Sequence, residues 1–325
     1  MLFSILQRNN FISFVLLPIV IIGLWFPYLL EPTMTIYYYD QNPMPLYKPL
    51  LHVYNSNNYI GFTVFFTAII LCLILLSYIN STFRMLEKRS SLYLLLFIVF
   101  SSFIPQFQQF NPMPFACIFV LLGIYSIYKL YKNEYELRAV FEAGFCFAIA
   151  SLLYIQTIFI SIFIFAGIIQ LVPFYWRQWI AGLFGLVTPY IFVVSWAFIN
   201  NSLPKLLETI DANIVVWHSW GEISLPFYIS IISIISIFII SLLFSFSGAL
   251  KKVALQKYYL LQFFLFLFVI IIFAIIPGAG IEIFYFSVIP LSFYITNYLL
   301  NIRNTLIPEI ITFILIGLRI FLFIA

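Results

Sequence analysis

The residues best suited to chemistry gather in two polar segments of the chain, 31–58 and 200–224. The two segments hold the only histidines, His52 and His218, and the acids Asp40, Glu208, Asp211 and Glu222, together with the aromatic residues Tyr37, Tyr38, Tyr39, Tyr47, Tyr54, Trp217 and Trp220. Two further acids, Glu31 and Glu282, lie at the edges of apolar runs. A carboxylate can act as a general base or bind a divalent metal, and an aromatic ring can stack on a sugar.

This composition predicts a site for a hydroxyl-rich ligand. We expect Asp40 to act as base or as ligand of a divalent metal, with Glu222 as a second acid. The expected substrate-binding residues are Tyr38, His52, Trp217, His218 and Trp220. No other metal or cofactor is expected. The alternative interpretation is structural, because tyrosine and tryptophan also form ordinary belts where a membrane meets water.

The elements that must position these residues are membrane helices. Of the 325 residues, 64% are hydrophobic and only 8% are charged, and mean hydropathy is +1.12. Soluble domains carry about 25% charged residues, so a water-exposed surface is excluded over most of the chain. The sequence therefore predicts an all-α, polytopic transmembrane bundle that forms one domain over residues 1–325. The net charge of +4 requires no nucleic-acid partner.

The stretch 144–176 carries no charged residue and can cross a bilayer twice, since about 20 residues suffice for one crossing. Gln156 and Thr157 are its polar break, which predicts a tight helical hairpin there. The following PFYWRQW run, with Arg177, is expected to be a loop tip at the membrane surface.

About eleven spans are expected. Their ranges are 11–30, 59–79, 91–104, 115–131, 139–155, 157–173, 180–199, 225–247, 259–277, 282–300 and 309–325. With the N-terminus in the cytoplasm, the cytoplasmic segments hold Arg8, Arg84, Lys88, Arg89, Lys129, Lys132, Arg138, Arg177, Lys251, Lys252, Lys257 and Arg303. Only Lys48 and Lys205 fall in outer loops, so the positive-inside rule favours this topology. We expect 11–30 to be a retained span and not a signal peptide, and we expect the chain to lie in a bacterial inner membrane.

Both long outer loops are expected to contain an interfacial helix. In 31–58, Pro45 can start a helix with Leu50 and Tyr54 on its apolar side. In 200–224, apolar residues recur at helical spacing from Leu203 to Trp217, with charged residues on the other side. An amphipathic helix lying flat on a membrane has this pattern.

Ionisable residues inside the predicted spans are few. Glu142 follows Arg138 by four residues, which favours an ordinary ion pair on one helix face. Arg319, six residues from the C-terminus, is expected to extend outwards as an anchor. Acids and bases at mid-span are lacking, which disfavours a coupled transporter. The three cysteines, Cys72, Cys117 and Cys146, are expected to pack as small apolar residues.

Some stretches also resemble known families. FEAGFCFAIASLLY (141–154) and WRQWIAGLFGLVTPYIF (176–192) are similar to an uncharacterised family of polytopic inner-membrane proteins from the Bacteroidota. Members of that family often carry a carotenoid-oxygenase label. That label requires four iron-binding histidines, and this chain has two. The layout more loosely resembles GT-C glycosyltransferases and O-antigen polymerases, whose catalytic acid lies in the first outer loop. Here that position is Asp40, a single acid in TIYYYDQNP where the GT-C pattern has a pair.

Two functions follow as expectations. The first is GT-C-like or polymerase-like handling of a polyprenyl-linked sugar at the periplasmic face, which would make the protein a membrane glycosyltransferase or polymerase. The second is a non-catalytic scaffold subunit of a cell-envelope complex. The expected partners are the lipid bilayer and either a polyprenyl-linked saccharide or an envelope protein.

Overall fold

The chain is described here from a computed structural model covering residues 17–25, 38–88, 90–131, 133, 135–216, 225–245, 252–302 and 306–324. Within these ranges every regular element is a helix and no strand occurs. Residues 17–25 form the first described helix. It is followed by α3 (Tyr38–Gln41), α4 (Tyr47–Ser56), α5 (Asn58–Phe83), α6 (Leu92–Ser101), α7 (Pro105–Gln108), α8 (Met113–Lys129) and α9 (Leu137–Leu153). The second half contains α10 (Thr157–Ile160), α11 (Ile162–Leu171), α12 (Trp176–Ile199), α13 (Leu203–Val215), α14 (Leu225–Phe244), α15 (Val253–Ile275), the 3-10 helix η2 (Ile281–Ser287), α16 (Val288–Asn301) and α17 (Leu306–Ile324).

Four helical segments among the described residues are long and apolar enough to cross a membrane. They are Asn58–Phe83, Trp176–Ile199, Val253–Ile275 and the continuous η2–α16 segment Ile281–Asn301. The all-α class is therefore confirmed, and the protein has the character of a membrane protein. Helices also occupy the other segments in which spans were predicted, but these are shorter or only partly described, so the number eleven stays a prediction.

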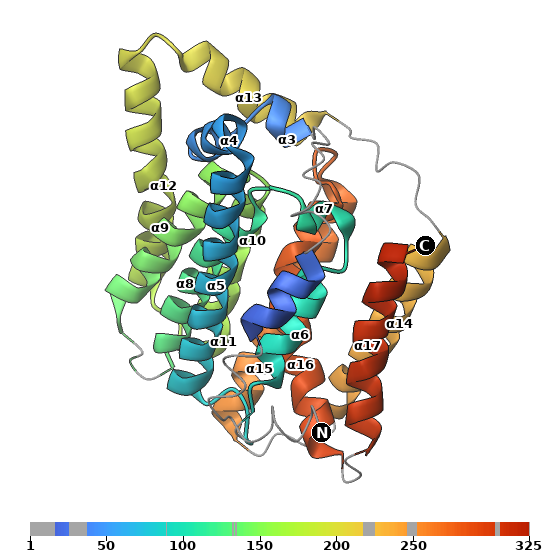
Figure 1. Cartoon of the computed structure of the whole chain (residues 1–325). Helices are drawn as coiled ribbons and strands as arrows, with labels where there is room; N and C mark the ends of the chain where they lie inside the picture. Colours follow the sequence, from blue (N-terminus) through green and yellow to red (C-terminus); the bar gives the residue numbers. More distant parts are fainter. Residues whose placement is uncertain are drawn as a thin grey trace.

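The long helices run side by side, and three helices lie across one end of them (Figure 1). α9 packs between α8 and α12, and α5 packs against α8 on the other side. α14 and α17 form a pair that contacts the rest through α16 and α6. α3, α4 and α13 lie across the top of the view, and we call this the α13 end of the molecule.

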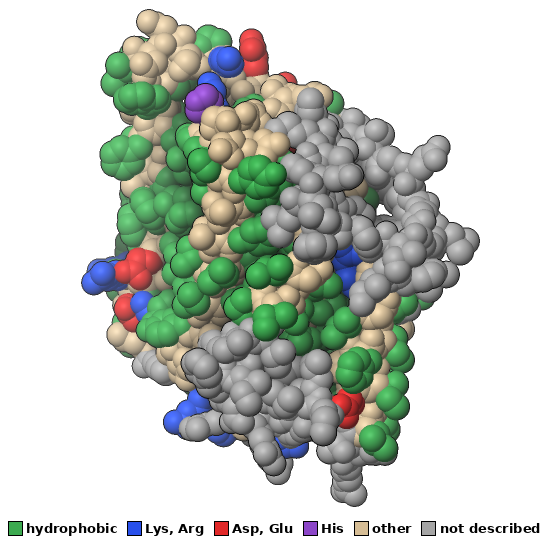
Figure 2. Space-filling view, viewed as in Figure 1, with side chains coloured by type: hydrophobic (Ala, Val, Ile, Leu, Met, Phe, Trp, Pro, Cys, Tyr) green, Lys and Arg blue, Asp and Glu red, His purple; other side chains and the backbone are tan. Residues whose placement is uncertain are grey.

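Helices occur where the two interfacial helices were predicted, but Leu207, expected on the apolar side of α13, is 59% exposed, and their position at a membrane surface stays a prediction. α13 exposes Lys205, Glu208 and Asp211, and it half-buries apolar residues such as Leu206 and Ile210. α4 begins at Tyr47, two residues after the expected start, and it buries Tyr54. Hydrophobic side chains cover most of the visible flank of the described helices, and charged side chains lie at the top, near the bottom and in a cluster half-way down the left edge (Figure 2). Such a surface suits an apolar surrounding along the flank and water at the ends.

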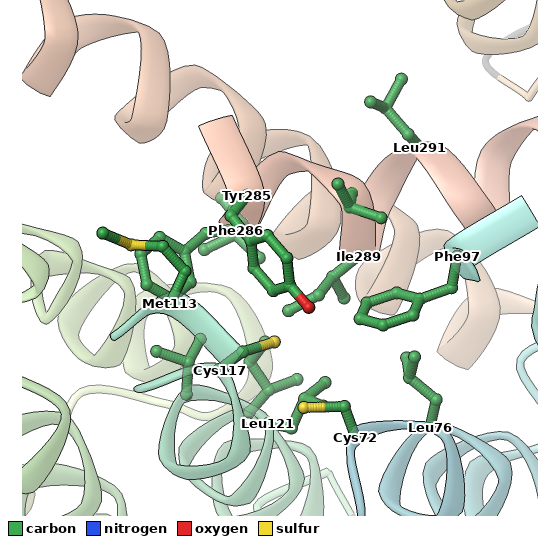
Figure 3. Close-up of a cluster of buried hydrophobic side chains, with 14 of the residues drawn as sticks. Cys72, Leu76, Phe97, Met113, Cys117, Leu121, Tyr285, Phe286, Ile289 and Leu291 are labelled. Carbon is green, nitrogen blue, oxygen red and sulfur yellow. The ribbon is translucent and has the colours of Figure 1, made fainter. Parts of the chain in front are cut away.

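The core of the bundle surrounds Tyr285 of η2 (Figure 3). Its ring packs edge-on against Phe97 of α6 and Phe107 of α7, at centroid distances of 6.3 and 5.2 Å. Its hydroxyl points towards Cys72 of α5 and Cys117 of α8. All five side chains are buried, so η2 is fixed in place by four other helices. The two cysteines are core residues, as expected, whereas Cys146 is only partly buried.

Two expectations about cationic residues were wrong, and one about an ion pair was right. Arg177 does not lie in a loop tip, because α12 begins at Trp176 and already includes the whole WRQW motif. Arg319 does not extend outwards; it is 4% exposed and donates a hydrogen bond to Gln108. α17 packs against α6 there, which turns Arg319 into the bundle. The Arg138–Glu142 pair forms as predicted, with Nε and Oε1 2.7 Å apart.

Candidate functional site

Asp40 lies in the short helix α3 at the α13 end, where a tyrosine fixes its carboxylate. The hydroxyl of Tyr47 donates to Asp40 Oδ1 over 2.9 Å. Tyr47 is itself fully buried in the first turn of α4 and stacks on Phe110, with ring centroids 6.2 Å apart. Burial, and then the nearby charge of Asp40, raise the pKa of Tyr47 well above its usual value of 10.0. The same two causes raise the pKa of Tyr54. Tyr47 therefore remains a hydrogen-bond donor to Asp40 at any physiological pH.

The structure brings a second acid to Asp40. Glu282 lies at the start of η2, four residues after Gly278, and hydrogen bonds of Gln156 and Asn213 join the α15–η2 connection to the segment just after Asp40. Its side chain is 5% exposed, and its Oε2 has no hydrogen-bond partner among the described residues. Among the described residues, no lysine or arginine forms an ion pair with Glu282. We call Asp40 and Glu282 the acid pair.

Gly280 provides the space for the second acid. A Cβ atom added at Gly280 would approach Glu282 Oε2 closer than the 3.0 Å that real Cβ contacts essentially never fall below. The core around Tyr285, three residues further on, holds η2 from the other side. The absence of a side chain at Gly280 thus leaves room for the Glu282 carboxyl in the position that it occupies.

A junction of hydrogen bonds joins the segments that carry the two acids. The amide nitrogen of Gln156 donates to the carbonyl oxygens of Asn213 (2.9 Å) and Gly278 (2.6 Å). The Asn213 side chain donates to the carbonyl of Asn42 over 2.9 Å, and Gly278 N–H donates to the carbonyl of Ile214 over 2.9 Å. We call these five residues the α13 junction. It ties the α3–α4 connection, the α9–α10 turn, α13 and the α15–η2 connection together.

The junction leaves one buried acceptor unused. Gln156 is fully buried, and it donates both of these hydrogen bonds from its amide nitrogen. Its Oε1 has no hydrogen-bond partner among the described residues. Buried polar atoms without partners are rare in folded proteins and call for a reason.

The residues predicted for the site have different outcomes. Asp40 is part-buried at the α13 end, while His52 is exposed on the surface of α4. Tyr38 is the first residue of α3. Glu222, Trp217, His218 and Trp220 lie outside the described residues, and their predicted roles stay predictions. Among the residues that the structure describes, no group of three or more His, Cys, Asp or Glu side chains is arranged to hold a metal ion.

Glu282, Gln156 and Asn213 were not predicted as site residues. Gln156 was recognised only as the polar break in an apolar stretch, and Glu282 only as an acid at the edge of a span. Rarity was the signal that pointed to them, because polar residues at membrane depth are expensive and are commonly functional. In chemical terms, the carboxylate of Asp40, fixed by Tyr47, can accept a proton or a hydrogen bond from a ligand hydroxyl.

Comparison with known proteins finds no matching family model, no similar curated protein and no similar solved structure.

Proposed function

We propose that the protein is a multi-pass inner-membrane protein that handles a polyprenyl-linked sugar at the periplasmic face, in the manner of GT-C glycosyltransferases or O-antigen polymerases. The observation that supports this proposal is the acid pair at the α13 end, directly linked to two amphipathic helices. A lipid-linked sugar has its polar head at the membrane surface, where α4 and α13 would lie. The acids would then meet the head group while the lipid stays in the bilayer.

In the proposed reaction Asp40 acts as general base. Its carboxylate takes the proton from an acceptor hydroxyl, that oxygen forms a bond to the anomeric carbon of the sugar, and the polyprenyl phosphate leaves with the electrons of the broken bond. Tyr47 keeps Asp40 oriented through the 2.9 Å hydrogen bond, and the base would have to lie within hydrogen-bond reach of the acceptor hydroxyl. A divalent metal at Asp40 is a variant of this proposal, with Glu282 as the second carboxylate ligand. Glu222, Tyr38, His52, Trp217, His218 and Trp220 remain proposed sugar contacts.

The test is a conservative substitution of the base with a matched control. Asp40→Asn keeps the size of the side chain and removes its basicity, so we expect at least a hundredfold loss of transfer, since general-base catalysis contributes about 10²–10⁴-fold. Asp211→Asn, an exposed acid on the outer side of α13, is the control. Each variant is expressed in a strain that lacks the wild-type gene and in which that deletion alters the surface glycan. The surface glycan is then measured by mass spectrometry. Full restoration of the glycan by Asp40→Asn refutes the base role.

A scaffold role in an envelope complex is the second candidate. The observation that favours it is α12, which exposes Phe184, Phe192 and Trp196 at 63–70% along a face that no described helix covers. A protein partner within the membrane would cover such a face as well as lipid does. If this candidate is correct, Phe192→Ala with Trp196→Ala releases a stoichiometric partner in native mass spectrometry, and Asp40→Asn releases none.

A further inference from the structure

The end of the molecule opposite α13 is rich in basic residues. The connection from α5 to α6, the start of α15 and the end of α16 lie at this end (Figure 1). In the sequence, the segments 84–89 and 251–257 contain one acid, Glu87, and six basic residues, which are Arg84, Lys88, Arg89, Lys251, Lys252 and Lys257. The two segments together therefore carry a large excess of positive charge.

Aromatic contacts hold the two basic segments side by side. Phe83, the last residue of α5, packs edge-on against Tyr258 of α15, with ring centroids 5.5 Å apart. Arg84 directly follows Phe83, and Lys257 directly precedes Tyr258. Lys257 Nζ lies 5.7 Å from the ring centroid of Tyr131, and that ring packs against Tyr258 with centroids 5.7 Å apart. The basic residues of the two segments therefore belong to one surface.

We call Arg84, Lys88, Lys252 and Lys257 the basic end. Lys88 ties the end of α16 to it, since its Nζ donates to the carbonyl of Leu300 over 2.6 Å. Arg84 and Lys252 are exposed, and Lys257 is half-buried. Among the described residues, none of these three forms an ion pair with an acid. The basic end therefore presents positive charge that a negatively charged partner can bind.

Exposed apolar side chains lie next to these cations. Ile74 and Tyr78 are four residues apart on one face of α5, which ends directly before Arg84, and they are 57% and 52% exposed. Val253, which is 61% exposed, directly follows Lys252. A phospholipid has the same order of chemistry, because its charged phosphate lies at the end of apolar acyl chains. A soluble phosphate compound would bind the cations and leave the apolar face of α5 without a partner.

We propose that the basic end binds the phosphate of an anionic phospholipid, whose acyl chains lie along the exposed face of α5. With the N-terminus in the cytoplasm, as the sequence predicts, this end meets the cytoplasmic leaflet of the membrane. The anionic lipids of that leaflet attract basic residues beside a membrane helix, and clusters of such residues bind lipid head groups. Binding of this kind does not depend on the sugar chemistry proposed above for the opposite end.

The test compares phosphatidylglycerol with phosphatidylcholine of the same acyl chains, which differ in net charge. The full chain in mild detergent is mixed with either lipid, and the bound fractions are measured by native mass spectrometry. We expect phosphatidylglycerol to bind at least tenfold more tightly at low salt, and the difference to shrink as salt is raised, because salt screens exposed charges. Lys252→Gln combined with Lys257→Gln removes two charges and is expected to reduce the preference at least tenfold. Lys48→Gln combined with Lys205→Gln, which changes two exposed lysines at the α13 end, is the matched control and should keep it.

Equal binding of the two lipids by the wild-type chain overturns the proposal, and this comparison does not depend on any variant folding. Retention of the full preference in the Lys252 and Lys257 double variant removes the basic end as its cause. An equal loss of preference in the control variant attributes it to the total charge of the chain and so also overturns the proposal. Displacement of phosphatidylglycerol by soluble glycerol phosphate would replace the lipid with a soluble phosphate compound as the ligand.

Discussion

Gly278→Ala is the sharpest perturbation of the α13 junction. A Cβ atom at Gly278 would lie closer than 3.0 Å to three backbone atoms, two in Asn213 and one in Ile214. Backbone atoms cannot rotate aside as a flexible side chain can, so the α15–η2 connection and the end of α13 must separate. A separation of roughly 1 Å takes the 2.9 Å hydrogen bond between Gly278 N–H and the Ile214 carbonyl out of range.

The separation also affects Gln156, whose amide nitrogen donates to one carbonyl in α13 and to one in the α15–η2 connection. Its bonds to Asn213 (2.9 Å) and Gly278 (2.6 Å) cannot both survive the separation. Two hydrogen bonds are therefore lost, which costs roughly 1–3 kcal/mol at 0.5–1.5 kcal/mol each. The lost hydrogen bonds weaken the attachment of α13 to the α15–η2 connection, and we expect the rest of the bundle to stay folded.

Hydrogen exchange followed by mass spectrometry measures that attachment directly. A loss of roughly 1–3 kcal/mol corresponds to about 5–150-fold faster exchange in peptides covering 203–215, since 1.4 kcal/mol is tenfold. Gly317→Ala is the matched control, because a Cβ atom there meets nothing within 4 Å. Alanine in a helix stabilises it relative to glycine, so Gly317→Ala should leave α13 unchanged. Equal exchange of 203–215 in the two variants would show that the junction does not hold α13.

Two further predictions concern the segment that carries Asp40. Tyr47→Phe removes a hydroxyl whose pKa is raised above 10.0 in the folded state by burial and then by the charge of Asp40. Above pH 10.0 the unfolded chain loses this proton more readily than the folded chain, so the wild-type protein loses stability as the pH rises and the variant loses less. The measurement is the thermal midpoint from about pH 8 to 11. Asn57→Ala removes the side-chain oxygen that accepts from the N–H groups of Tyr59 and Ile60 at the start of α5. We expect about 1 kcal/mol of destabilisation, and Asn57→Asp, which keeps an accepting oxygen, should retain most of the stability. An unaltered midpoint in Asn57→Ala would contradict the capping role.

Local patterns in the sequence were sufficient for features that depend on one helix or one turn. The faces of α13 followed from apolar residues at helical spacing, and the turn at Gln156 followed from polarity within an apolar stretch. The Arg138–Glu142 pair followed from a separation of four residues. Each of these features depends only on residues within about two helical turns of one another, and such residues are close together in the sequence.

Features that depend on packing between distant helices could not be predicted. Arg319 was expected to reach the membrane surface because it lies near a chain end, but Gln108, in another helix, accepts its hydrogen bond inside the bundle. The acid pair consists of Asp40 in α3 and Glu282 in η2, and most of the other helices lie between these two residues in the sequence. No periodicity relates the two positions, so the sequence left Asp40 as a single acid.

The way the acid pair is held argues for a binding site over an accident of packing. Tyr47 fixes Asp40 from α4, and the core around Tyr285 fixes η2, the helix in which Glu282 lies. A purely structural role would be served better by apolar residues of similar volume, because replacing buried charged groups in this way is often neutral or stabilising. Two acids on segments that the α13 junction joins instead fit a polar site at the α13 end, as the proposed function requires.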